Sequence, residues 1–415
     1  MSVRRLCVIA YHSSPLIEPG SGDAGGMTVY VRELAEALSQ RGLQTDIFTR
    51  AAEERPGATE ISPGVRVICI PAGPPALVDK EELSGYLSEF VAGIAAYSTG
   101  TRIAYDLVHS HYWQSGLAAS ALASRWRVPL VHSHHTLGRV KNGHLAPGDV
   151  PESQTRLDGE AQVIAAADVL VASTDQEWEQ LACLYGAPHD RLKTLHPGVD
   201  HELFHPGDRP AARRELGFSD TAVMLYVGRV QPLKGIELAV RAAEQLVPAL
   251  DKPLAFLIVG GASGRGGERE LDRLHDLVEE FGLQDTVRFV GPQPHSRLPL
   301  FYRAADALVV CSHSESFGLA ALEAHACGTP VVGTPVGGLG HIVHDGLSGF
   351  LVDSRDPAVF AQRLKTVLAD RNLAASFGSA AVHSARSFSW DRTADEFLEL
   401  YECLVREPWP EACTC

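Results

Sequence analysis

Two cations in the second half of the chain are spaced to meet a diphosphate. In "VGRVQPLKGIE" (227–237), a strand-like run ends at Gly228, Arg229 follows it, and Lys234 stands near the start of the next helix. Arginine offers a planar fork of donors, lysine a mobile point charge, and a helix N-terminus unpaired backbone N–H groups. Solvated surface charges are the ordinary alternative for such a pair. The convergence of both cations on one point nevertheless favours a diphosphate site.

Two carboxylates further along the chain suit sugar hydroxyls. "SHSESFGLAALEAHACGTPVVG" (312–333) places Glu315 just after a strand-like run and Glu323 eight residues later on a helix pattern. A carboxylate can accept hydrogen bonds from both hydroxyls of a ribose diol, and the turn between the two can donate backbone N–H groups. Glu323 has almost entirely apolar or small neighbours, so its charge requires a partner. The predicted contacts from this segment are Glu315, Phe317, Gly318, Leu319 and Glu323.

Adjacent glycines in the first half mark a second place of close approach. "GSGDAGGMTVYVREL" (20–34) puts Gly25 and Gly26 between the first strand-like run and a helix pattern. Without a Cβ atom, both positions let a ligand reach the backbone and the helix N-terminus. A third Gly-rich turn, "GGASGRGGE" (260–268), lacks the spacing of a dinucleotide fingerprint and the acidic residue that should follow it, so a nicotinamide enzyme is disfavoured.

Short apolar runs alternate with amphipathic stretches throughout the chain, which indicates parallel sheets with helices on both faces. One helix pattern buries Tyr30, Leu34 and Leu38 on a single face. The segment 196–216 contains three Pro-containing turns and no periodicity, and it is predicted to be an irregular linker. The predicted strands are 5–12, 45–50, 65–72, 105–112, 129–136 and 168–174 before the linker, and 222–230, 254–261, 286–293, 306–313, 329–336 and 348–353 after it.

The resulting fold class is α/β, with two doubly wound, Rossmann-like domains facing each other across a deep cleft. We predict an N-terminal domain over 1–203 and a C-terminal domain over 204–387. The remainder, 388–415, is predicted to be a helix with a frayed tail. A chain of 415 residues suits two domains of this size.

Composition limits the possible partners. Hydrophobic content of 45% and charged content of 21% are those of a soluble globular protein. The formal net charge of −15 comes without a basic patch, so nucleic acid is an unlikely partner and any phosphate must be held by local groups. No apolar run is long enough to span a bilayer or to form a signal peptide, which predicts a cytoplasmic protein without membrane insertion.

The second-half motifs carry a family resemblance. "GRVQPLKG" (228–235), "ESFGLAALEA" (315–324) and "GTPVVG" (328–333) resemble the donor half of retaining GT-B glycosyltransferases of family four, whose Glu-x7-Glu motif matches Glu315 and Glu323. First-half motifs match too, so the likeness covers nearly the whole chain. It implies that the C-terminal domain, 204–387, is a nucleotide-sugar-binding domain that takes a nucleotide-diphosphate sugar, and that the N-terminal domain, 1–203, is an acceptor-binding domain that takes a small-molecule acceptor. The resemblance implies as well that the helix within 388–415 crosses back to the first domain. It also implies retention of anomeric configuration, no obligatory metal or other cofactor, and a homodimer.

The acceptor-side motifs "GSGDAGGM", "KEEL", "HSHYW", "HHTLGRVKN" and "PESQTR" resemble one branch of that family. Its members transfer N-acetylglucosamine from UDP to an inositol phosphate in mycothiol synthesis. The resemblance implies that Lys80, Tyr112, Thr136 and Arg156 grip the acceptor phosphate, and two cations with a phenol and a hydroxyl form a chemically reasonable cage. The acceptor side further includes His12, Asp23 and Thr28.

His135 in "HSHHT" matches an active-site position beside the donor sugar, and His12 and His111 also follow strand-like runs. The catalytic set implied by the resemblance is therefore His135, Arg229, Lys234 and Glu315. In the corresponding mechanism, the acceptor hydroxyl attacks from the face on which the diphosphate leaves, through an oxocarbenium-like state. Arg229 and Lys234 stabilise the charge that develops on the leaving group, and hinge closure excludes water.

Two positions depart from the branch and keep other acceptors open. Thr28 stands where its members carry Asn, and Gln293 stands in a donor segment where many of them carry Arg. An antibiotic-pathway relative that joins a nucleotide-activated sugar to an aminocyclitol or a small thiol is the main alternative. The sequence also leaves open whether the donor nucleotide contains uridine or guanosine. A nucleotide-sugar epimerase or phosphorylase of the same architecture is disfavoured by the Glu-x7-Glu element. A non-catalytic sugar-nucleotide sensor is disfavoured because every expected donor residue is present.

Overall fold

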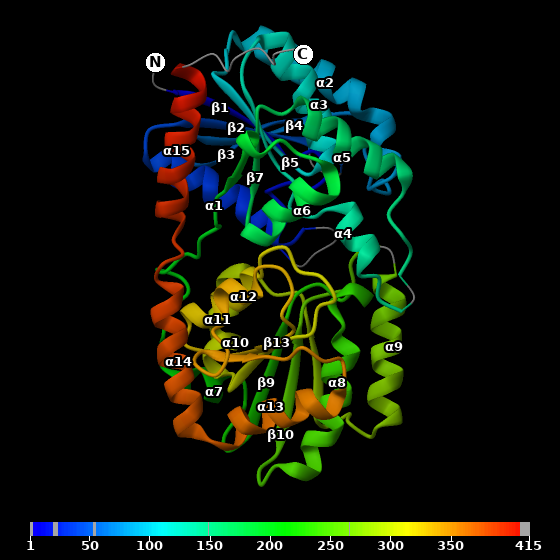
Figure 1. Ribbon diagram of the computed structural model, residues 1–415, viewed down its shortest axis with the longest axis vertical. Helices are drawn as coiled ribbons and strands as arrows, with labels where there is room; N and C mark the ends of the chain where they lie inside the picture. Colours follow the sequence, from blue (N-terminus) through cyan, green and yellow to red (C-terminus); the bar gives the residue numbers. More distant parts are fainter. Residues whose placement is uncertain (1–2, 20–23, 53–54, 148, 265, 407–415) are drawn as a thin grey trace.

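Two sheets stand one above the other along the long axis of the computed structural model (Figure 1). The structure describes residues 3–19, 24–52, 55–147, 149–264 and 266–406. Helices cover both faces of each sheet, so the predicted α/β class with two doubly wound units is confirmed. The domain boundaries proposed from the sequence stay predictions.

The first sheet has eight strands in the order β3-β4-β2-β1-β5-β6-β7-β8. All neighbours are parallel except β3, which pairs antiparallel with β4 at one edge. Strands are added to one side of β1 up to β4 and to the other side from β5 onward. This switch in strand order opens a crevice at the carboxyl ends of β1 and β5. The strand bounds are β1 Arg5–Ile9, β2 Gln44–Ala51, β3 Gly57–Ser62, β4 Val65–Pro71, β5 Leu107–His111, β6 Leu130–Ser133, β7 Val169–Ala172 and β8 Leu192–Thr194.

The second sheet has six parallel strands in the order β11-β10-β9-β12-β13-β14. The strand order switches sides between β9 and β12, which places a second crevice at the carboxyl ends of those two strands. The bounds are β9 Ala222–Val227, β10 Leu254–Val259, β11 Val287–Gly291, β12 Ala307–Val310, β13 Val331–Gly333 and β14 Gly349–Leu351.

All twelve predicted strands are present, and two further strands were missed. Strand β3 is an edge strand whose residues are mostly exposed, so it lacks an apolar signal, and β8 has only three residues. The helices are α1 Gly26–Gln40, α2 Leu87–Thr101, α3 Trp113–Trp126, α4 Gly138–Gly143, α5 Gln154–Ala166, α6 Asp175–Tyr185, α7 Arg209–Glu215, α8 Ile236–Leu246, α9 Gly267–Glu280, α10 Leu298–Ala304, α11 Leu319–Ala326, α12 Leu339–Ile342, α13 Pro357–Ala369, α14 Arg371–Ala385 and α15 Trp390–Arg406.

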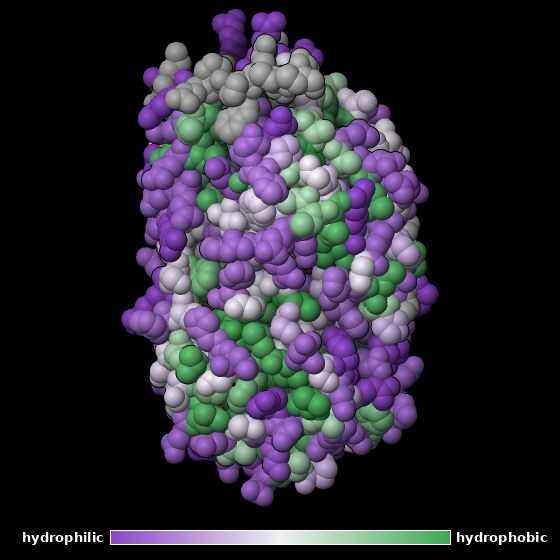
Figure 2. Space-filling view, viewed as in Figure 1, coloured by the Kyte–Doolittle hydropathy of each residue, from purple (hydrophilic) through white to green (hydrophobic). Residues whose placement is uncertain are grey.

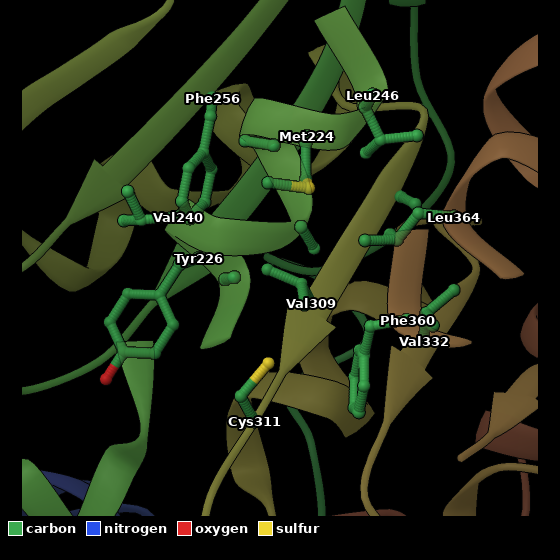
Figure 3. Close-up of a cluster of buried hydrophobic side chains, with 14 of the residues drawn as sticks. Met224, Tyr226, Val240, Leu246, Phe256, Val309, Cys311, Val332, Phe360 and Leu364 are labelled. Atoms are coloured by element: carbon green, nitrogen blue, oxygen red, sulfur yellow. The ribbon is translucent and has the colours of Figure 1, made fainter. Parts of the chain in front are cut away.

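Alternate residues of the central strands supply separate cores on the two faces of each sheet. Cys7 and Ile9 of β1 pack with α2 and α3, whereas Leu6 and Val8 pack with α1 and α15. In the second sheet, Met224 and Tyr226 of β9 pack in the same way with α8 and α13, as Figure 3 shows. Burial on both faces explains why these strands have near-continuous apolar sequences.

The prediction of a fully irregular segment at 196–216 was wrong at its end. Helix α7 occupies Arg209–Glu215, and the side chain of Asp208 caps it by accepting a hydrogen bond from the Ala211 N–H at 2.9 Å. Pro210 lies in the first turn, where the missing N–H of proline is tolerated. The sequence "DRPAARREL" thus contains a helix start rather than a turn.

The chain crosses between the two sheets twice, and the crossings lie side by side. Val199 forms an isolated parallel bridge with Ser389, and the backbone of Gly198 is so close to Ser389 and Trp390 that a Cβ atom there would lie 2.2 Å from the Trp390 nitrogen. After the second crossing, α15 runs along the first sheet (Figure 1). Its apolar side, including Phe397 and Tyr401, is buried against α1 and β1.

The surface is mixed in character. In the view of Figure 2, hydrophilic side chains cover most of the face, with smaller hydrophobic areas between them.

Among the described cysteines, Cys7, Cys69, Cys311 and Cys327 are buried, whereas Cys183 and Cys403 are exposed. Within the described part of the chain, no helix is both long and apolar enough to cross a membrane.

Helix α15 is anchored to the first sheet by a buried hydrogen bond, which gives a testable prediction. The Tyr401 hydroxyl lies 2.7 Å from Nδ1 of His109 on β5. Tyr401→Phe leaves that nitrogen unpaired in the core, so we expect a loss of about 1–3 kcal/mol in the free energy of unfolding. Urea denaturation measures it. Tyr97→Phe is the matched control, because the Tyr97 side chain is only partly buried, and an equal effect of both changes would contradict the anchor.

Candidate nucleotide-sugar site

A cavity of about 310 Å³ lies where the carboxyl ends of the two sheets face each other. Its walls come from both sheets, and it contains most of the residues predicted from the sequence. Predicted residues that line it are Gly25, Gly26, His135, Thr136, Arg229, Lys234, Gln293, Glu315, Phe317, Gly318, Leu319 and Glu323. His12, Thr28, Lys80, Tyr112 and Arg156 lie outside its lining, and Asp23 lies outside the described residues.

The N-terminus of α1 reaches across the cavity to the second sheet. A Cβ atom on Gly25 would lie 3.3 Å from Nε of Arg229, and one on Gly26 would lie 3.4 Å from Cδ1 of Leu319. These glycines therefore let the first helix of one sheet approach the cation and the turn of the other. The exposed N–H groups at the start of α1 are available to an anion at this point.

Lys234 and Glu315 form an ion pair at the floor of the cavity. Nζ of Lys234 lies 2.7 Å from Oε2 of Glu315, which also accepts a hydrogen bond from the Ser312 hydroxyl at 3.0 Å. Arg229 lies opposite, and its carbonyl accepts a hydrogen bond from the Tyr226 hydroxyl at 2.7 Å. Among the described residues, the Arg229 guanidinium has no carboxylate within ion-pair distance. It is thus available to an incoming phosphate.

The turn that carries Glu315 rests on a second pair of glycines that sequence reasoning missed. Gly337 has φ +55°, and a Cβ atom there would lie 1.6 Å from the Glu315 carbonyl oxygen. The Gly338 Cβ position is 2.2 Å from the Phe317 carbonyl oxygen. The adjacent glycines in "PVGGLG", directly after a predicted strand, were the signal that could have identified this contact.

Residues 317–319 turn the chain into α11. Gly318 has φ 101° and is the N-cap of α11, a conformation that suits glycine. Phe317 is buried against Phe388, with ring centroids 5.8 Å apart. Gln293 lines the cavity from the segment after β11, and its amide donates to the neighbouring Pro292 carbonyl at 3.0 Å.

Glu323 is buried near the middle of α11, and both of its carboxylate oxygens have protein partners. Oε1 lies 2.8 Å from Nε2 of His295, and Oε2 accepts a hydrogen bond from the Tyr302 hydroxyl at 2.7 Å. The expectation that this carboxylate needs a partner is confirmed. His295 also lines the cavity, and no sequence pattern indicated its contact with Glu323.

His135 follows β6 in the left-handed region, with φ 60°. Its Nε2 lies 2.9 Å from Nδ1 of His111, and its carbonyl accepts a hydrogen bond from the Ser316 hydroxyl of the opposite sheet. Burial lowers the pKa of His135 to about 3, so the ring is neutral at physiological pH. A neutral imidazole on the cavity wall can exchange hydrogen bonds with a sugar hydroxyl.

The predicted acceptor residues form a compact cluster around the ring of Tyr112. Nζ of Lys80 lies 5.4 Å from the ring centroid, and Cζ of Arg156 lies 5.1 Å from it. The His12 ring centroid is 4.4 Å from that of Tyr112. Arg156 also donates to the Thr136 hydroxyl at 3.0 Å. The structure thus brings together all four residues of the predicted phosphate cage.

Arg156 is buried and has two carboxylate partners that the sequence did not reveal. Nε donates to Oε1 of Glu160 at 2.8 Å, and Nη1 lies 2.9 Å from Oε1 of Glu152, which also pairs with Lys141. Glu160 accepts further hydrogen bonds from the Gly138 N–H and the Tyr185 hydroxyl. The cluster is therefore a balanced network of charges, as burial requires.

Cations of the acceptor cluster and of the cavity both act on His12. Burial, followed by the charges of Lys80, Arg229 and Arg156, holds the pKa of His12 well below its ordinary value. The His12 imidazole is therefore neutral. Thr28 is buried, and its hydroxyl is 2.9 Å from that of Ser13, so it lies behind the cavity wall.

No group of three or more His, Cys, Asp or Glu side chains within the described ranges is arranged to hold a metal ion. The expectation that catalysis needs no metal or other cofactor stays a prediction.

Known structures define the class. Sucrose-phosphate synthase from Thermosynechococcus elongatus superimposes with a TM-score of 0.90 at 33% identity, over 97% of this chain and 99% of that one. Anabaena HepE, solved in complex with UDP and glucose, has a TM-score of 0.76 at 20% identity over 97% of this chain and shares the fold. The two-sheet architecture and its cleft are those of the GT-B glycosyltransferases.

Sequence comparison identifies the family. Residues 25–198 match the model of the "Glycosyl transferase 4-like domain", and residues 208–383 match that of "Glycosyl transferases group 1". The chain belongs to this family of glycosyltransferases. It is 47% identical to D-inositol 3-phosphate glycosyltransferase 2 of Catenulispora acidiphila over 97% of this chain and 96% of the relative. It is also 47% identical to D-inositol 3-phosphate glycosyltransferase of Thermobifida fusca, over 96% and 93%.

The contact under Glu315 predicts a sharp effect of one methyl group. Gly337→Ala forces its Cβ atom into the Glu315 carbonyl at a φ that alanine resists, so the turn must move. We expect glycosyl transfer to fall at least about tenfold, equivalent to about 1.4 kcal/mol in the transition state. Initial rates measure it. Gly340→Ala, where a Cβ atom meets nothing within 4 Å, should retain activity, and a fully active Gly337→Ala enzyme would rule out this support.

Proposed function

We propose that the protein transfers N-acetylglucosamine from UDP to an inositol phosphate with retention of anomeric configuration. The observation that carries this proposal is the cation cluster around Tyr112, which lies in a chain 47% identical over nearly its whole length to D-inositol 3-phosphate glycosyltransferases. The cluster supplies two cations beside a sugar-nucleotide cavity. A phosphorylated cyclitol is an acceptor of matching charge.

In this proposal the second sheet binds the donor. Arg229 and Lys234 contact the diphosphate, with the start of α1 opposite them, and Glu323 accepts hydrogen bonds from the ribose hydroxyls. Glu315 and the N–H groups of residues 317–319 hold the sugar, and Gln293 lies near the base. The support is that all of these residues line one cavity.

The acceptor binds on the first sheet. Lys80, Tyr112, Thr136 and Arg156 take its phosphate, and the His12 ring packs beside that of Tyr112. Thr28 acts from behind the wall through its hydrogen bond with Ser13. Asp23 keeps its proposed acceptor role on the sequence resemblance alone.

For the reaction we propose front-face attack. The acceptor hydroxyl approaches the anomeric carbon from the side on which UDP departs, and its proton passes to the leaving phosphate oxygen. Arg229 and Lys234 stabilise the negative charge that grows on UDP, and His135 contacts the sugar as a neutral imidazole. The ion pair between Lys234 and Glu315 holds both side chains in place before the substrate arrives.

Closure of the two sheets about the paired crossings at Val199 and Ser389 is the proposed motion that excludes water. A homodimer and a cytoplasmic location complete the proposal. The homodimer rests on the family resemblance, and the location rests on the sequence, which has no apolar run long enough to span a bilayer or form a signal peptide.

An aminocyclitol is a second candidate acceptor, and Glu152 favours it. This carboxylate forms ion pairs with Arg156 and Lys141 at the edge of the cluster. It can accept a hydrogen bond from an ammonium group, which the cations of the cluster would otherwise repel.

A product assay distinguishes the two acceptor classes. The enzyme is incubated with UDP-N-acetylglucosamine and either inositol phosphate or an aminocyclitol, and the products are identified by mass spectrometry. We expect a glycosylated inositol phosphate whose anomeric proton shows the donor's configuration by NMR. Transfer to the aminocyclitol alone would replace the leading proposal by the second one, and an inverted product would remove the front-face mechanism.

Lysines on opposite sides of the cavity should separate the two substrates. Lys80→Ala is expected to raise the acceptor KM at least tenfold, about 1.4 kcal/mol, while the donor KM changes less than twofold. Lys234→Ala should instead lower kcat by about 10²- to 10³-fold, because it removes charge stabilisation on the leaving group. Steady-state kinetics with each substrate varied gives both values, and Lys365→Ala on the exposed side of α13 is the control. Equal loss of acceptor and donor affinity in Lys80→Ala would contradict the assignment.

A further inference from the structure

Both carboxylate oxygens of Glu323 form hydrogen bonds with side chains from one neighbouring segment. His295 belongs to the single-turn helix His295–Arg297, and Tyr302 belongs to α10, which follows directly. Their contacts with Oε1 and Oε2 are 2.8 and 2.7 Å. Tyr302 is fully buried, whereas His295 lines the cavity. Of the two partners, His295 is therefore the one beside the ligand.

The surroundings of His295 favour its charged form. The ring of Phe204 packs against it with centroids 5.0 Å apart, and three carboxylates, Glu323, Glu33 and Asp200, act on it. Although burial works against the charge, Glu323, together with its hydrogen bond, and the other two carboxylates raise the pKa of His295 above its ordinary value. Glu33 comes from α1, so the first sheet contributes to the charge of a residue in the second.

We propose that His295 is a positioning residue that orients the carboxylate of Glu323 toward the ribose hydroxyls of the nucleotide. This inference rests on the proposed role of Glu323 in donor binding. A carboxylate that is fixed at one oxygen can still rotate about its last bond, whereas one that is fixed at both oxygens has a defined plane. Each oxygen then keeps further acceptor capacity for a ribose hydroxyl.

Charge gives His295 a second effect on the same contact. A bare carboxylate beside a diphosphate would repel it, and the cost rises with burial. An imidazolium paired with Glu323 offsets that charge. The pair therefore lets a buried carboxylate serve a ligand that is itself an anion.

Removal of one ligand hydroxyl tests the proposal. Dissociation constants for UDP and 2′-deoxy-UDP are measured by isothermal titration calorimetry for the wild type, His295→Phe and His295→Gln. We expect the wild type to bind UDP about tenfold more tightly than the deoxy ligand, a difference of about 1.4 kcal/mol. His295→Phe should reduce that ratio to below about threefold. His295→Gln, which keeps an N–H donor, should restore most of it.

The ratio separates positioning from a general structural effect. Loss of packing alone would weaken both ligands equally and leave the ratio unchanged, which would overturn the proposal. His383→Gln, on an exposed part of α14, is the matched control and should keep the wild-type ratio. If the wild type binds GDP instead of UDP, the uridine donor is wrong, and the pair GDP and 2′-deoxy-GDP gives the same test.

A wild-type enzyme that binds both members of a pair equally would remove the ribose role of Glu323, and with it the role of His295. A wild-type ratio near ten that persists in His295→Phe would overturn the positioning role alone. The failure of the proposed donor site and the failure of this inference are thus distinguishable.

Discussion

The close contact of the α1 N-terminus with the second sheet is the constraint on which the cleft depends. Gly25 and Gly26 bring a helix start against Arg229 and Leu319: a Cβ atom at Gly25 would lie 3.3 Å from Nε of Arg229, and one at Gly26 would lie 3.4 Å from Cδ1 of Leu319. The Ser316 hydroxyl connects the two sheets at a second point by donating to the His135 carbonyl. Because the strand ends of both sheets converge there, a ligand in the cavity touches both at once. A side chain larger than a methyl group at Gly25 would therefore displace the Arg229 guanidinium from its place beside the cavity.

Charge inside the cleft is balanced by local pairs. The chain as a whole carries −15, yet its buried cations meet specific carboxylates: Lys234 meets Glu315, and Arg156 meets Glu152 and Glu160. Burying any of these charges alone would cost several kcal/mol, so each partner offsets the other's desolvation. Arg229 is the exception among the cations that line the cavity, because it has no carboxylate within ion-pair distance among the described residues. Of the two carboxylates on Arg156, Glu152 is partly exposed at the edge of the cluster, whereas Glu160 is fully buried.

The sequence predicted the parts of the site that come from strand ends and missed those that come from contacts between loops. Strand periodicity located Arg229, Glu315 and His135, because the carboxyl ends of parallel strands must meet at one edge. It could not reveal that Gly337 supports the Glu315 turn or that His295 contacts Glu323, since the members of these pairs lie 22 and 28 residues apart and belong to different turns and helices that no shared period connects. The α7 helix was missed for a different reason, because Pro210 was taken as a turn residue when it lies in a helix start.

The second crossing of the chain links the hinge to the active-site wall. Trp390, the first residue of α15, packs edge-on against Tyr30 with centroids 5.4 Å apart, and Tyr30 packs in the same way against His135 at 4.9 Å. Trp390 also lies against Gly198 on the first crossing. A rotation of the sheets about these crossings must therefore change the packing beneath His135, because densely packed rings transmit small displacements. The position of the His135 imidazole therefore depends on how the two sheets are packed at these crossings.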